Sequence, residues 1–531
     1  METAELVLAL RDPAAYPFEV AEVGFLETHV SLLFFAGERV YKVKKPVDLG
    51  FLDFSTLERR RHFCEEEVRL NRRLAPDTYL GVVEFRRDAA GAVRVGGAGE
   101  LVEPAVEMRR LPAERMLEAL LERGEVDNQL VRALAVFLAR FHAEAATGPG
   151  VDEHGSPEAV AANVRENFEQ TRGFAGGKGA RTISSALHAF LERRAERFLA
   201  ERRELLERRV REGRIRDGHG DLHSGNVCFP PERIVIYDCI EFSARYRCSD
   251  VACDLAFLAM DLDLRGFRGF GRFLEHAYAG EAGDVGLAEL TGFYKEYRAV
   301  VRAKVQSILA SDEGAEPERR EAARLSAMRY WHLAASYGLP PALILVCGLP
   351  GSGKSWAARE LGRPFEAVVL SSDVIRKRLA GVPLTERRRG GRGSREELYS
   401  TEMTDRTYRA MLAEAERALA SGRTVIADAT FASLSRRADF RALARDLGVP
   451  FALVHVTASE ALVRQRMERR RSDEHEVSDA DFAVYRLMQR QFQPPDELPP
   501  TELVEMASGS EPPEEATARL IDLLVEGSSP R

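Results

Sequence analysis

The sequence lacks the features of a membrane or secreted protein. No apolar run among its 531 residues approaches the ~20 residues that span a bilayer. Residues 1–5, Met-Glu-Thr-Ala-Glu, carry negative charge and lack the positive charge with which a signal peptide begins. A positive net charge is also missing. The formal charge of -8 at pH 7 argues against a protein that coats nucleic acid through a basic surface, and leaves only local contacts with polyanions. We expect a cytoplasmic protein without a membrane partner.

Cysteine is scarce and is not arranged in pairs. The six cysteines include no C-x-x-C motif and lie mostly in apolar segments, which is typical of reduced thiols in a reducing compartment. The cysteines from Cys228 to Cys253 are close enough in sequence that a metal site formed by them is an alternative. Their irregular spacing favours buried thiols instead.

Length and composition indicate a globular protein of several domains. A chain of 531 residues is too long for one ordinary core, and one domain per about 150 residues allows two to four domains. Hydrophobic residues make up 45% of the chain and charged residues 30%, so enough apolar surface is available to offset the entropy of ordering the chain.

The first part of the chain predicts a domain of two lobes. Residues 1 to about 105 alternate short apolar runs with turns, and residues 31–43 do so in the form of a hairpin. A small β-rich lobe follows from this pattern. From about residue 106 to 337 the apolar spacing is mainly helical, which predicts a larger α lobe. The fold class expected for residues 1–337 is therefore bilobal α+β.

The remainder predicts an α/β domain with a parallel sheet. Residues 338–341, which are Gly-Leu-Pro-Pro, break the helical pattern, so the second domain is expected at 342–531. Short and almost wholly apolar runs, separated by helical stretches, follow at residues 343–346, 367–370, 424–427 and 451–456. Strands buried on both faces of a parallel sheet have this composition. Residues 497–531 predict a last helix between loose segments.

A glycine-rich segment follows the first of these runs and predicts a nucleotide site. It reads G-x-x-x-x-G-K-S and lies between a strand and a helix, which is the setting of a P-loop. Its glycines let backbone N–H groups surround phosphate oxygens at the positive end of the helix dipole. Lys354 is expected to reach the β- and γ-phosphates of ATP, and Ser355 to bind Mg²⁺. The predicted ATP-binding residues are Gly348, Gly351, Ser352, Gly353, Lys354 and Ser355.

Charged residues at the next strand ends favour a kinase over simple nucleotide binding. Asp373 is expected to accept the proton of an attacking hydroxyl, and Arg376, one helical turn later, to hold the transferred phosphate. Asp428 ends an apolar run in the form of a Walker B carboxylate that binds Mg²⁺. Helix capping remains an alternative for both aspartates. Arg466 and Arg470 belong to an arginine-rich helix that either forms a catalytic lid or simply faces solvent.

These residues resemble the P-loop kinases that include polynucleotide 5′-kinase, zeta toxins and many small-molecule kinases. The resemblance covers about residues 342–500 and rests on Asp373 with Arg376, on the segment at 428–431 and on the arginine-rich helix. It implies phosphoryl transfer from ATP to a hydroxyl, with Asp373 as the base. The basic segment 387–395 has two interpretations. It contacts a polyanion, or, as the simpler explanation, its arginines are exposed to solvent.

A second catalytic pattern lies in the first domain. Residues 219–226 have the H-x-D-x-x-x-x-N spacing of a kinase catalytic loop, and a strand ending in Asp238 follows about a dozen residues later. Asp221 is expected to accept the hydroxyl proton, while Asn226 and Asp238 bind Mg²⁺.

Such a lobe also needs a lysine on an earlier strand, paired with a helical glutamate. Lys42 lies in a strand pattern, with Lys44 as the fallback. Glu67 falls on the apolar face of a predicted helix, where an unpaired carboxylate would cost several kcal/mol, so we predict a Lys42–Glu67 ion pair. Glu66 is the alternative partner, and an exposed Glu67 on the surface is the simpler explanation.

These residues resemble the aminoglycoside phosphotransferase-like branch of the kinase fold, which includes choline, fructosamine and homoserine kinases. The resemblance covers about residues 20–330 and extends to Asp254 with the two residues that follow it. Asp238 opens Asp-Cys-Ile where protein kinases have Asp-Phe-Gly, and a clear G-x-G-x-x-G loop is missing, which fits the small-molecule branch. The resemblance implies that Glu107 and Met108 belong to the hinge against which adenine stacks.

Taken together, the motifs predict a tandem ATP-dependent phosphotransferase that uses Mg²⁺ and acts on hydroxyl groups of small molecules at two sites. One alternative makes the C-terminal domain a kinase of nucleic-acid 5′-hydroxyl ends. Another makes one domain a nucleotide sensor that regulates the other. Intact catalytic carboxylates at both sites, Asp221 and Asp373, disfavour a mere sensor.

Overall fold

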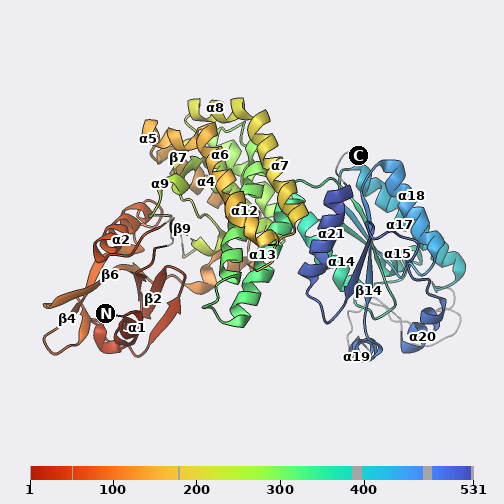
Figure 1. The fold of residues 1–531 in the computed structure, drawn as a ribbon, viewed down its shortest axis with the longest axis horizontal. Coiled ribbons are helices and arrows are strands. Elements are labelled where there is room, and N and C mark those ends of the chain that lie inside the picture. The colour runs from red at the N-terminus through yellow and green to blue at the C-terminus, as the bar shows by residue number, and fades with distance from the viewer. Residues whose placement is uncertain are drawn as a thin grey trace. The chain divides into compact units, whose positions relative to one another are not determined.

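The structure, a computed structural model, describes residues 2–48, 50, 52–176, 180–231, 233–384, 398–470 and 481–527. The basic residues 387–395 therefore lie outside the described residues. The chain folds into two compact units, Met1–Asn163 with Leu199–Lys295, and Val164–Phe198 with Glu296–Arg531 (Figure 1). This division groups residues by packing. The domain limits expected from the sequence, 1–337 and 342–531, stay a prediction.

The first unit contains a six-stranded antiparallel sheet with the order β1-β2-β3-β6-β4-β5. The strands are Val23–Glu27 (β1), Ser31–Ala36 (β2), Arg39–Lys44 (β3), Tyr79–Arg87 (β4), Val93–Val95 (β5) and Glu100–Arg109 (β6). The expected hairpin is confirmed, because β2 and β3 pair from Ser31 with Lys44 to Ala36 with Arg39. Gly37 closes the turn with φ of 56°, a conformation that favours glycine.

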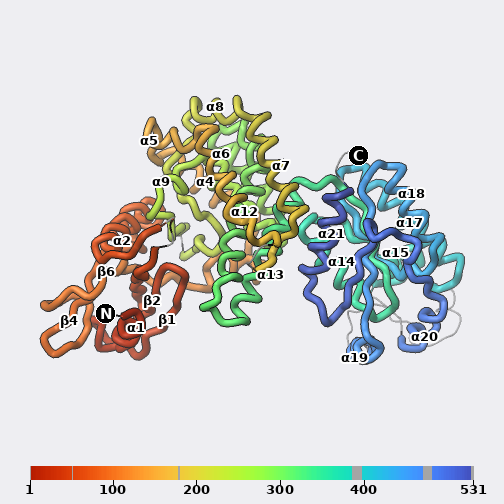
Figure 2. The backbone as a smooth tube through the Cα atoms, viewed as in Figure 1, coloured from red at the N-terminus to blue at the C-terminus, as the bar shows by residue number. Residues whose placement is uncertain are grey.

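Helix α2 (Leu57–Asn71) packs against β4 and β6 of this sheet (Figure 2). Thr56 caps it, with its hydroxyl accepting from the Arg59 N–H at 3.2 Å. The buried residues of the helix include Cys64, Glu67 and Val68. Glu67 therefore stands on the covered face of the helix, as its position among apolar residues predicts.

Helices and short strands complete the first unit. The strands form two antiparallel pairs, β7 (Ile215–Asp217) with β10 (Cys248–Asp250) and β8 (Val227–Cys228) with β9 (Val235–Ile236). The helices are α1 (Thr3–Leu10), α3 (Leu117–Glu122), α4 (Asn128–Glu144), α5 (Pro149–Asp152), α8 (Arg203–Arg211), α9 (Ala244–Arg247), α10 (Val251–Leu264) and α11 (Arg268–Ala282). Helix α10 is buried along almost its whole length, so its polar side chains are fixed in the interior. Three further helices have residues in both units, namely α6 (Pro157–Thr171), α7 (Ser185–Glu201) and α12 (Ala288–Ala310).

The second unit contains a five-stranded parallel sheet with the order β12-β13-β11-β14-β15. Its strands are Leu343–Cys347 (β11), Val368–Ser371 (β12), Val425–Asp428 (β13), Phe451–Thr457 (β14) and Leu503–Ala507 (β15). The first four are the strands expected from the apolar runs. All five residues of the central strand β11 are buried, which explains why its sequence is apolar throughout.

Helices cover both faces of this sheet (Figure 1). Helices α14 and α21 share one apolar core with Ile344 and Val454, and α15, α17 and α18 share the other with Leu345 and Leu453. The helices are α13 (Pro317–Ser336), α14 (Lys354–Gly362), α15 (Ser372–Leu379), α17 (Thr401–Ala420), α18 (Leu434–Leu447), α19 (Glu460–Arg470), α20 (Phe482–Gln491) and α21 (Pro513–Gly527). The last helix expected from the sequence is α21. None of the helices in the described ranges combines the length and the apolar composition needed to span a bilayer.

Candidate active sites

The predicted catalytic loop of the first unit is fixed to a buried helix. The backbone N–H groups of His219 and Gly220 donate to the two carboxylate oxygens of Asp254 in α10, at 2.6 and 2.8 Å. Gly220 has φ of 84°, and a Cβ at this position would lie 3.0 Å from the carbonyl oxygen of Tyr246. Glycine is therefore the residue that lets the loop take this path without strain.

Asp221 and Asn226, the expected base and metal ligand, lie together on this loop. The Asn226 side-chain amide donates to the Asp221 carbonyl oxygen at 3.0 Å. The Asp221 carboxylate lies 3.6 Å from His223 Nε2 and is 31% exposed, so it is open to solvent. Behind the loop, the buried Asp261 carboxylate accepts hydrogen bonds from both the N–H and the hydroxyl of Ser224. Hydrogen bonds to Asp254 and Asp261 of α10 therefore hold the loop that carries Asp221 and Asn226.

Asp238 meets Lys42 from a distant part of the chain. Asp238 follows β9 with φ of 64°, and its N–H donates to Tyr79 Oη at 3.1 Å. Residues other than glycine seldom adopt this conformation, which persists where surrounding contacts hold it. Lys42 Nζ lies 2.5 Å from Asp238 Oδ1, and the Asp238 side chain is 44% exposed. An ammonium group therefore stands directly beside the expected metal ligand.

The expected ion pair between Lys42 and Glu67 is present, and Lys44 shares it. Lys42 Nζ donates to Glu67 Oε1 at 2.8 Å, and Lys44 Nζ donates to Glu67 Oε2 at 2.7 Å. Burial opposes ionisation of the Glu67 carboxyl, but the two lysines outweigh it and lower its pKa from 4.5 to about 2. Glu66 instead bonds Arg69 on the same helix at 2.7 Å. Glu67 is fully buried, so both alternatives, an exposed Glu67 and a Glu66 partner, are wrong.

The two residues expected in the hinge, Glu107 and Met108, lie near the end of β6 in different surroundings. Tyr41 Oη donates to Glu107 Oε1 at 3.0 Å. Met108 is 7% exposed and belongs to an apolar cluster with Val40 and Val106. Met108 is therefore part of an apolar surface of the sheet, whereas Glu107 is held by a tyrosine. Their roles in binding ATP stay predictions.

The P-loop of the second unit joins β11 to α14, as expected. Gly351 and Gly353 have φ of 81° and 96°, and a Cβ at Gly348 would lie 2.4 Å from the carbonyl oxygen of Val456. Side chains at these positions would distort the loop or fill the space around it. Helix α14 begins at Lys354, and its N-cap residue, Gly353, has no side chain that could occupy the helix N-terminus. Its first backbone N–H groups and the positive end of its dipole thus remain available to an anion.

Asp428 ends β13 beside this loop in the environment of a metal ligand. It is 3% exposed, and its Oδ1 has no hydrogen-bond partner among the described residues. The pKa of the Asp428 carboxyl is raised above its ordinary value, mainly because the group is buried. The nearby Asp373 acts in the same direction, whereas Lys354 and a hydrogen bond from Ser355 oppose the shift. Ser352 Oγ is also buried and has no hydrogen-bond partner within the described part of the chain. Orphaned buried oxygens are uncommon, and the Asp428 carboxylate beside the Ser355 hydroxyl offers oxygen ligands of the kind that Mg²⁺ prefers, so these residues fit that ion.

The two remaining residues expected near the acceptor, Asp373 and Arg376, differ in their surroundings. Asp373 lies in the first turn of α15, whose N-cap residue is Ser371, so Asp373 is not the cap itself. Arg376 is 7% exposed, and its Nη1 donates to the Leu398 carbonyl oxygen at 3.3 Å and to Thr404 Oγ1 at 3.0 Å. These contacts of Arg376 are with α17 and the residues before it, not with the P-loop.

Arg466, the expected lid arginine, contacts the P-loop backbone. Its Nη1 donates to the Ser352 carbonyl oxygen at 2.8 Å, and its Nη2 donates to Ser508 Oγ at 2.9 Å. Elsewhere on α19, Val463 and Met467 belong to an apolar cluster against which Leu349 of the P-loop packs. Arg470 closes the helix, and its side chain lies outside the described structure.

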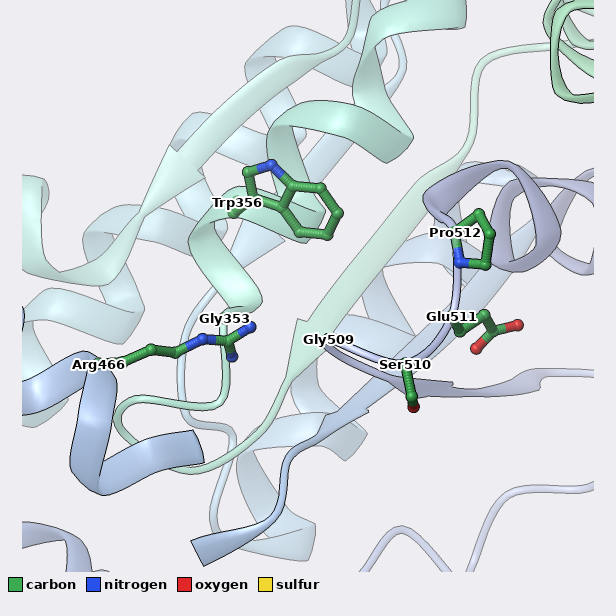
Figure 3. A pocket seen from close by; sticks show the side chains of 7 residues that line it. All are labelled: Gly353, Trp356, Arg466, Gly509, Ser510, Glu511 and Pro512. Atoms are coloured by element: carbon green, nitrogen blue, oxygen red, sulfur yellow. The ribbon is translucent and has the colours of Figure 1, made fainter. Parts of the chain in front are cut away.

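A pocket of about 650 Å³ opens beside the P-loop (Figure 3). Trp356 of α14 stands on one side of it, the loop between β15 and α21 on the other, and Arg466 reaches toward Gly353. Its lining residues are Gly353, Trp356, Arg466, Gly509, Ser510, Glu511 and Pro512. Trp356 and the loop at 509–512 were not among the residues predicted from the sequence. The position of Trp356 directly after Lys354 and Ser355 is the one signal that points to it, whereas the loop carries no motif.

Cysteine does not build a further site in the structure. All six cysteines are buried and form no disulfide. Within the described part of the chain, there is no cluster of three or more histidine, cysteine, aspartate or glutamate side chains that suits a metal ion.

Two protein families match the chain in succession. The phosphotransferase enzyme family matches residues 40–292, and the AAA domain family matches residues 343–495. Uncharacterized proteins of Mycobacterium tuberculosis and Mycobacterium bovis are 34% identical to the chain over 420 residues, which cover 79% of this chain and 80% of each relative. The chain belongs to the family of these proteins. In this chain the two matching families follow each other, which confirms the predicted fusion of a phosphotransferase-type domain with a P-loop domain and its α+β and parallel α/β fold classes.

Several solved structures are weakly similar to the chain. A choline/ethanolamine kinase family protein from Mesorhizobium loti is 15% identical with a TM-score of 0.37, over 62% of this chain and 98% of its own. A gluconokinase from Sinorhizobium meliloti is 21% identical with a TM-score of 0.24, over 35% of this chain and 93% of its own. The APS kinase of Mycobacterium tuberculosis is 22% identical with a TM-score of 0.26, over 35% and 98%.

Proposed function

We propose that this chain is a tandem phosphotransferase in which each of two sites moves the γ-phosphoryl group of ATP to a hydroxyl group. The observation that carries the proposal is the meeting of Lys42, Glu67 and Asp238, because these residues come from three separate parts of the sequence. The P-loop beside the buried Asp428 supports the same activity for the second site. Each site thus combines a cation for phosphate with carboxylates for a metal and a proton.

At the first site, Lys42 binds the α- and β-phosphates of ATP, and Glu67 holds that lysine in place. Asp238 and Asn226 are the residues that would hold Mg²⁺, which neutralises phosphate charge when it is bound. A carboxylate and a side-chain amide are oxygen ligands of the kind this ion prefers. Asp221 accepts the hydroxyl proton while the hydroxyl oxygen bonds to the γ-phosphorus and the bond to the β-phosphate oxygen breaks, releasing ADP.

At the second site, the P-loop N–H groups and Lys354 surround the β- and γ-phosphates. Ser355 and Asp428 are the residues that would hold the metal ion, and Asp373 accepts the hydroxyl proton as the same bonds form and break. Arg466 bonds the P-loop backbone, so its charge lies where phosphate charge accumulates.

Two arginines and the pocket complete this assignment. The pocket beside Gly353 takes the nucleobase, because it adjoins the P-loop and offers the flat face of Trp356. Arg376 supports the site indirectly through α17, since its guanidinium bonds Leu398 and Thr404. Arg470 stays a candidate for the lid.

The acceptor at both sites is proposed to be a hydroxyl group of a small molecule. A nucleic-acid 5′-hydroxyl remains the second candidate for the P-loop site, favoured by the basic residues 387–395 and disfavoured by the net charge of -8. Phosphorylation of an oligonucleotide 5′ end that is lost in Asp373→Ala would establish that candidate. A domain that binds ATP and transfers nothing in any assay would instead be a sensor.

The test is a screen of hydroxyl compounds with Mg²⁺ and ATP, scored by the mass shift of the product. Asp221→Asn should lower turnover at the first site by roughly 10²–10⁴-fold with ATP binding nearly kept, because only proton acceptance is lost. Lys354→Ala should reduce transfer at the second site alone. Asp77→Asn is the matched control, since that side chain is 70% exposed and pairs with Arg233. Undiminished phosphorylation in Asp221→Asn would contradict the assignment.

A further inference from the structure

Two lysines on one strand share a single glutamate in the first unit. Lys42 and Lys44 are two residues apart on β3, so their side chains project from the same face of the sheet. Their ammonium groups lie 2.8 and 2.7 Å from the two oxygens of Glu67. Each lysine then contacts a further carboxylate, Asp238 for Lys42 and Glu241 for Lys44. The result is a row of alternating charges in the order Asp238, Lys42, Glu67, Lys44 and Glu241.

Burial distinguishes the two ends of this row. The Lys44 side chain is 1% exposed, Glu241 is 8% exposed, and the Phe54 ring covers the Lys44 ammonium group with its centroid at 4.8 Å. The Lys42 side chain is 13% exposed and its partner Asp238 is 44% exposed. A phosphate arriving from solvent therefore meets Lys42 and not Lys44.

Glu67 lies between the lysines and is fully buried. Lys42 contacts one oxygen of Glu67 and Lys44 contacts the other. The two ammonium groups thus neutralise a carboxylate that would be strongly unfavourable in the interior without a partner. Lys44 fixes Glu67 from the buried side, so Glu67 can hold Lys42 while that lysine exchanges Asp238 for a phosphate.

Glu241 ties the same lysine to the segment that carries Asp238. Only two residues, Cys239 and Ile240, lie between Asp238 and Glu241, and the Cys239 N–H fixes this stretch by donating to Asn71 Oδ1 at 2.8 Å. The Ile240 N–H donates to the His219 carbonyl oxygen at 3.1 Å. The contact between Lys44 and Glu241 therefore joins β3 to both the expected metal ligand and the catalytic loop.

We infer that Lys44 is a positioning residue of the first site: together with Glu241 it anchors the buried Glu67, so that Glu67 holds Lys42 while Lys42 exchanges Asp238 for the phosphates of ATP. This inference rests on the proposed function of that site. It assigns different tasks to the two lysines, with phosphate contact for Lys42 and anchoring of Glu67 for Lys44.

The test compares two ligands at the first site, ATP and adenosine, by calorimetry with Mg²⁺ present. The parent protein carries Lys354→Ala, so that the P-loop site does not contribute to ATP binding. Lys44→Met should weaken ATP roughly ten- to hundredfold, the value of a lost hydrogen bond to a charged group, and leave adenosine unchanged because adenosine has no phosphates. Lys44→Arg should restore part of the ATP affinity.

Two further variants keep the test decisive. Lys45→Met is the matched control, since Lys45 pairs with the half-exposed Glu27 and should leave both affinities unchanged. The double variant Lys44→Met with Glu241→Gln removes the pair without changing the net charge of the row, so it answers the question if Lys44→Met alone does not fold. It should show the same selective loss of ATP affinity.

Three outcomes would count against the inference. An equal loss for ATP and adenosine would show that Lys44 only supports the fold. An undiminished effect of Lys44→Met in a Lys42→Met background would show that Lys44 does not act through Lys42. ATP binding that is unchanged in Lys44→Met would also overturn it while leaving the proposed function intact. If the Lys354→Ala parent binds neither ATP nor adenosine, the proposed function of the first site itself fails.

Discussion

At the scale of residues, the P-loop site has its own optical probe. The chain contains two tryptophans, Trp331 and Trp356. Trp356 is 40% exposed and lines the pocket beside the P-loop, while Trp331 is fully buried. The Trp331 Nε1–H has no hydrogen-bond partner among the described residues, so a phenylalanine there loses no hydrogen bond. A Trp331→Phe protein therefore reports on Trp356 alone.

In that protein, ATP should quench the tryptophan fluorescence in a saturable way, because an adenine ring that stacks on the Trp356 indole changes its surroundings. Tripolyphosphate should compete with ATP for the P-loop but should not quench, since it has no base. The measurement is a fluorescence titration with each ligand in the presence of Mg²⁺. Equal quenching by both ligands would show that the base does not lie in this pocket.

Most of these candidate residues could be predicted from the sequence because their chemistry leaves a local pattern. The P-loop, the loop of Asp221 and the strand end at Asp238 have fixed spacings, and Glu67 stands out as a carboxylate on an apolar face. The contacts between Lys44 and Glu241 and the pocket wall at 509–512 join segments far apart in sequence. No spacing rule predicts such meetings, because the fold alone creates them.

At the scale of elements, a buried arginine fastens the helix that supports the catalytic loop. Arg209 of α8 bonds both carboxylate oxygens of Asp250 at 2.7 Å and also bonds Asp284, which follows α11. Asp250 in turn caps α10, accepting from the Ala252 N–H at 2.8 Å. Helix α10 carries Asp254, whose carboxylate holds the loop of the expected base. The ion cluster therefore stabilises three elements and one functional loop.

Arg209→Met should destabilise the protein by about 3–5 kcal/mol, because it leaves two buried carboxylates without their partner. Arg208→Met is the matched control. Arg208 is 44% exposed and pairs with the surface glutamates Glu212 and Glu289, so its loss should cost less than about 1 kcal/mol. Urea denaturation followed by circular dichroism measures both values. Equal stability of the two variants would mean that the buried cluster is not needed for the fold.

The secondary structure was predictable wherever the apolar pattern had one clear period. The hairpin of β2 and β3 and the strands β11 to β14 appear where expected. Strand β15 was missed, since it lies at the edge of the sheet and its residues alternate between buried and exposed in a Pro- and Glu-rich stretch. The strand expected before Asp238 is β9, whereas the segments that form β7, β8 and β10 are two or three residues long and too short for any periodicity.

At the scale of the whole molecule, the two proposed nucleotide sites have separate residue sets. The first draws on β3, α2, the catalytic loop and Asp238, and the second on the P-loop, Asp428 and the pocket at Trp356. No residue belongs to both sets. The two matching families follow each other along the chain without overlap, which agrees with two independent sites in one protein.

The number of ATP molecules bound per chain tests this claim most directly, and it does not require the acceptor to be known. Equilibrium dialysis with Mg²⁺ and a slowly hydrolysed ATP analogue should give two bound molecules for the unaltered chain, one for Lys354→Ala, one for Lys42→Met and none for the double variant. One molecule per unaltered chain, or a single variant that abolishes all binding, would contradict the account of two separate sites.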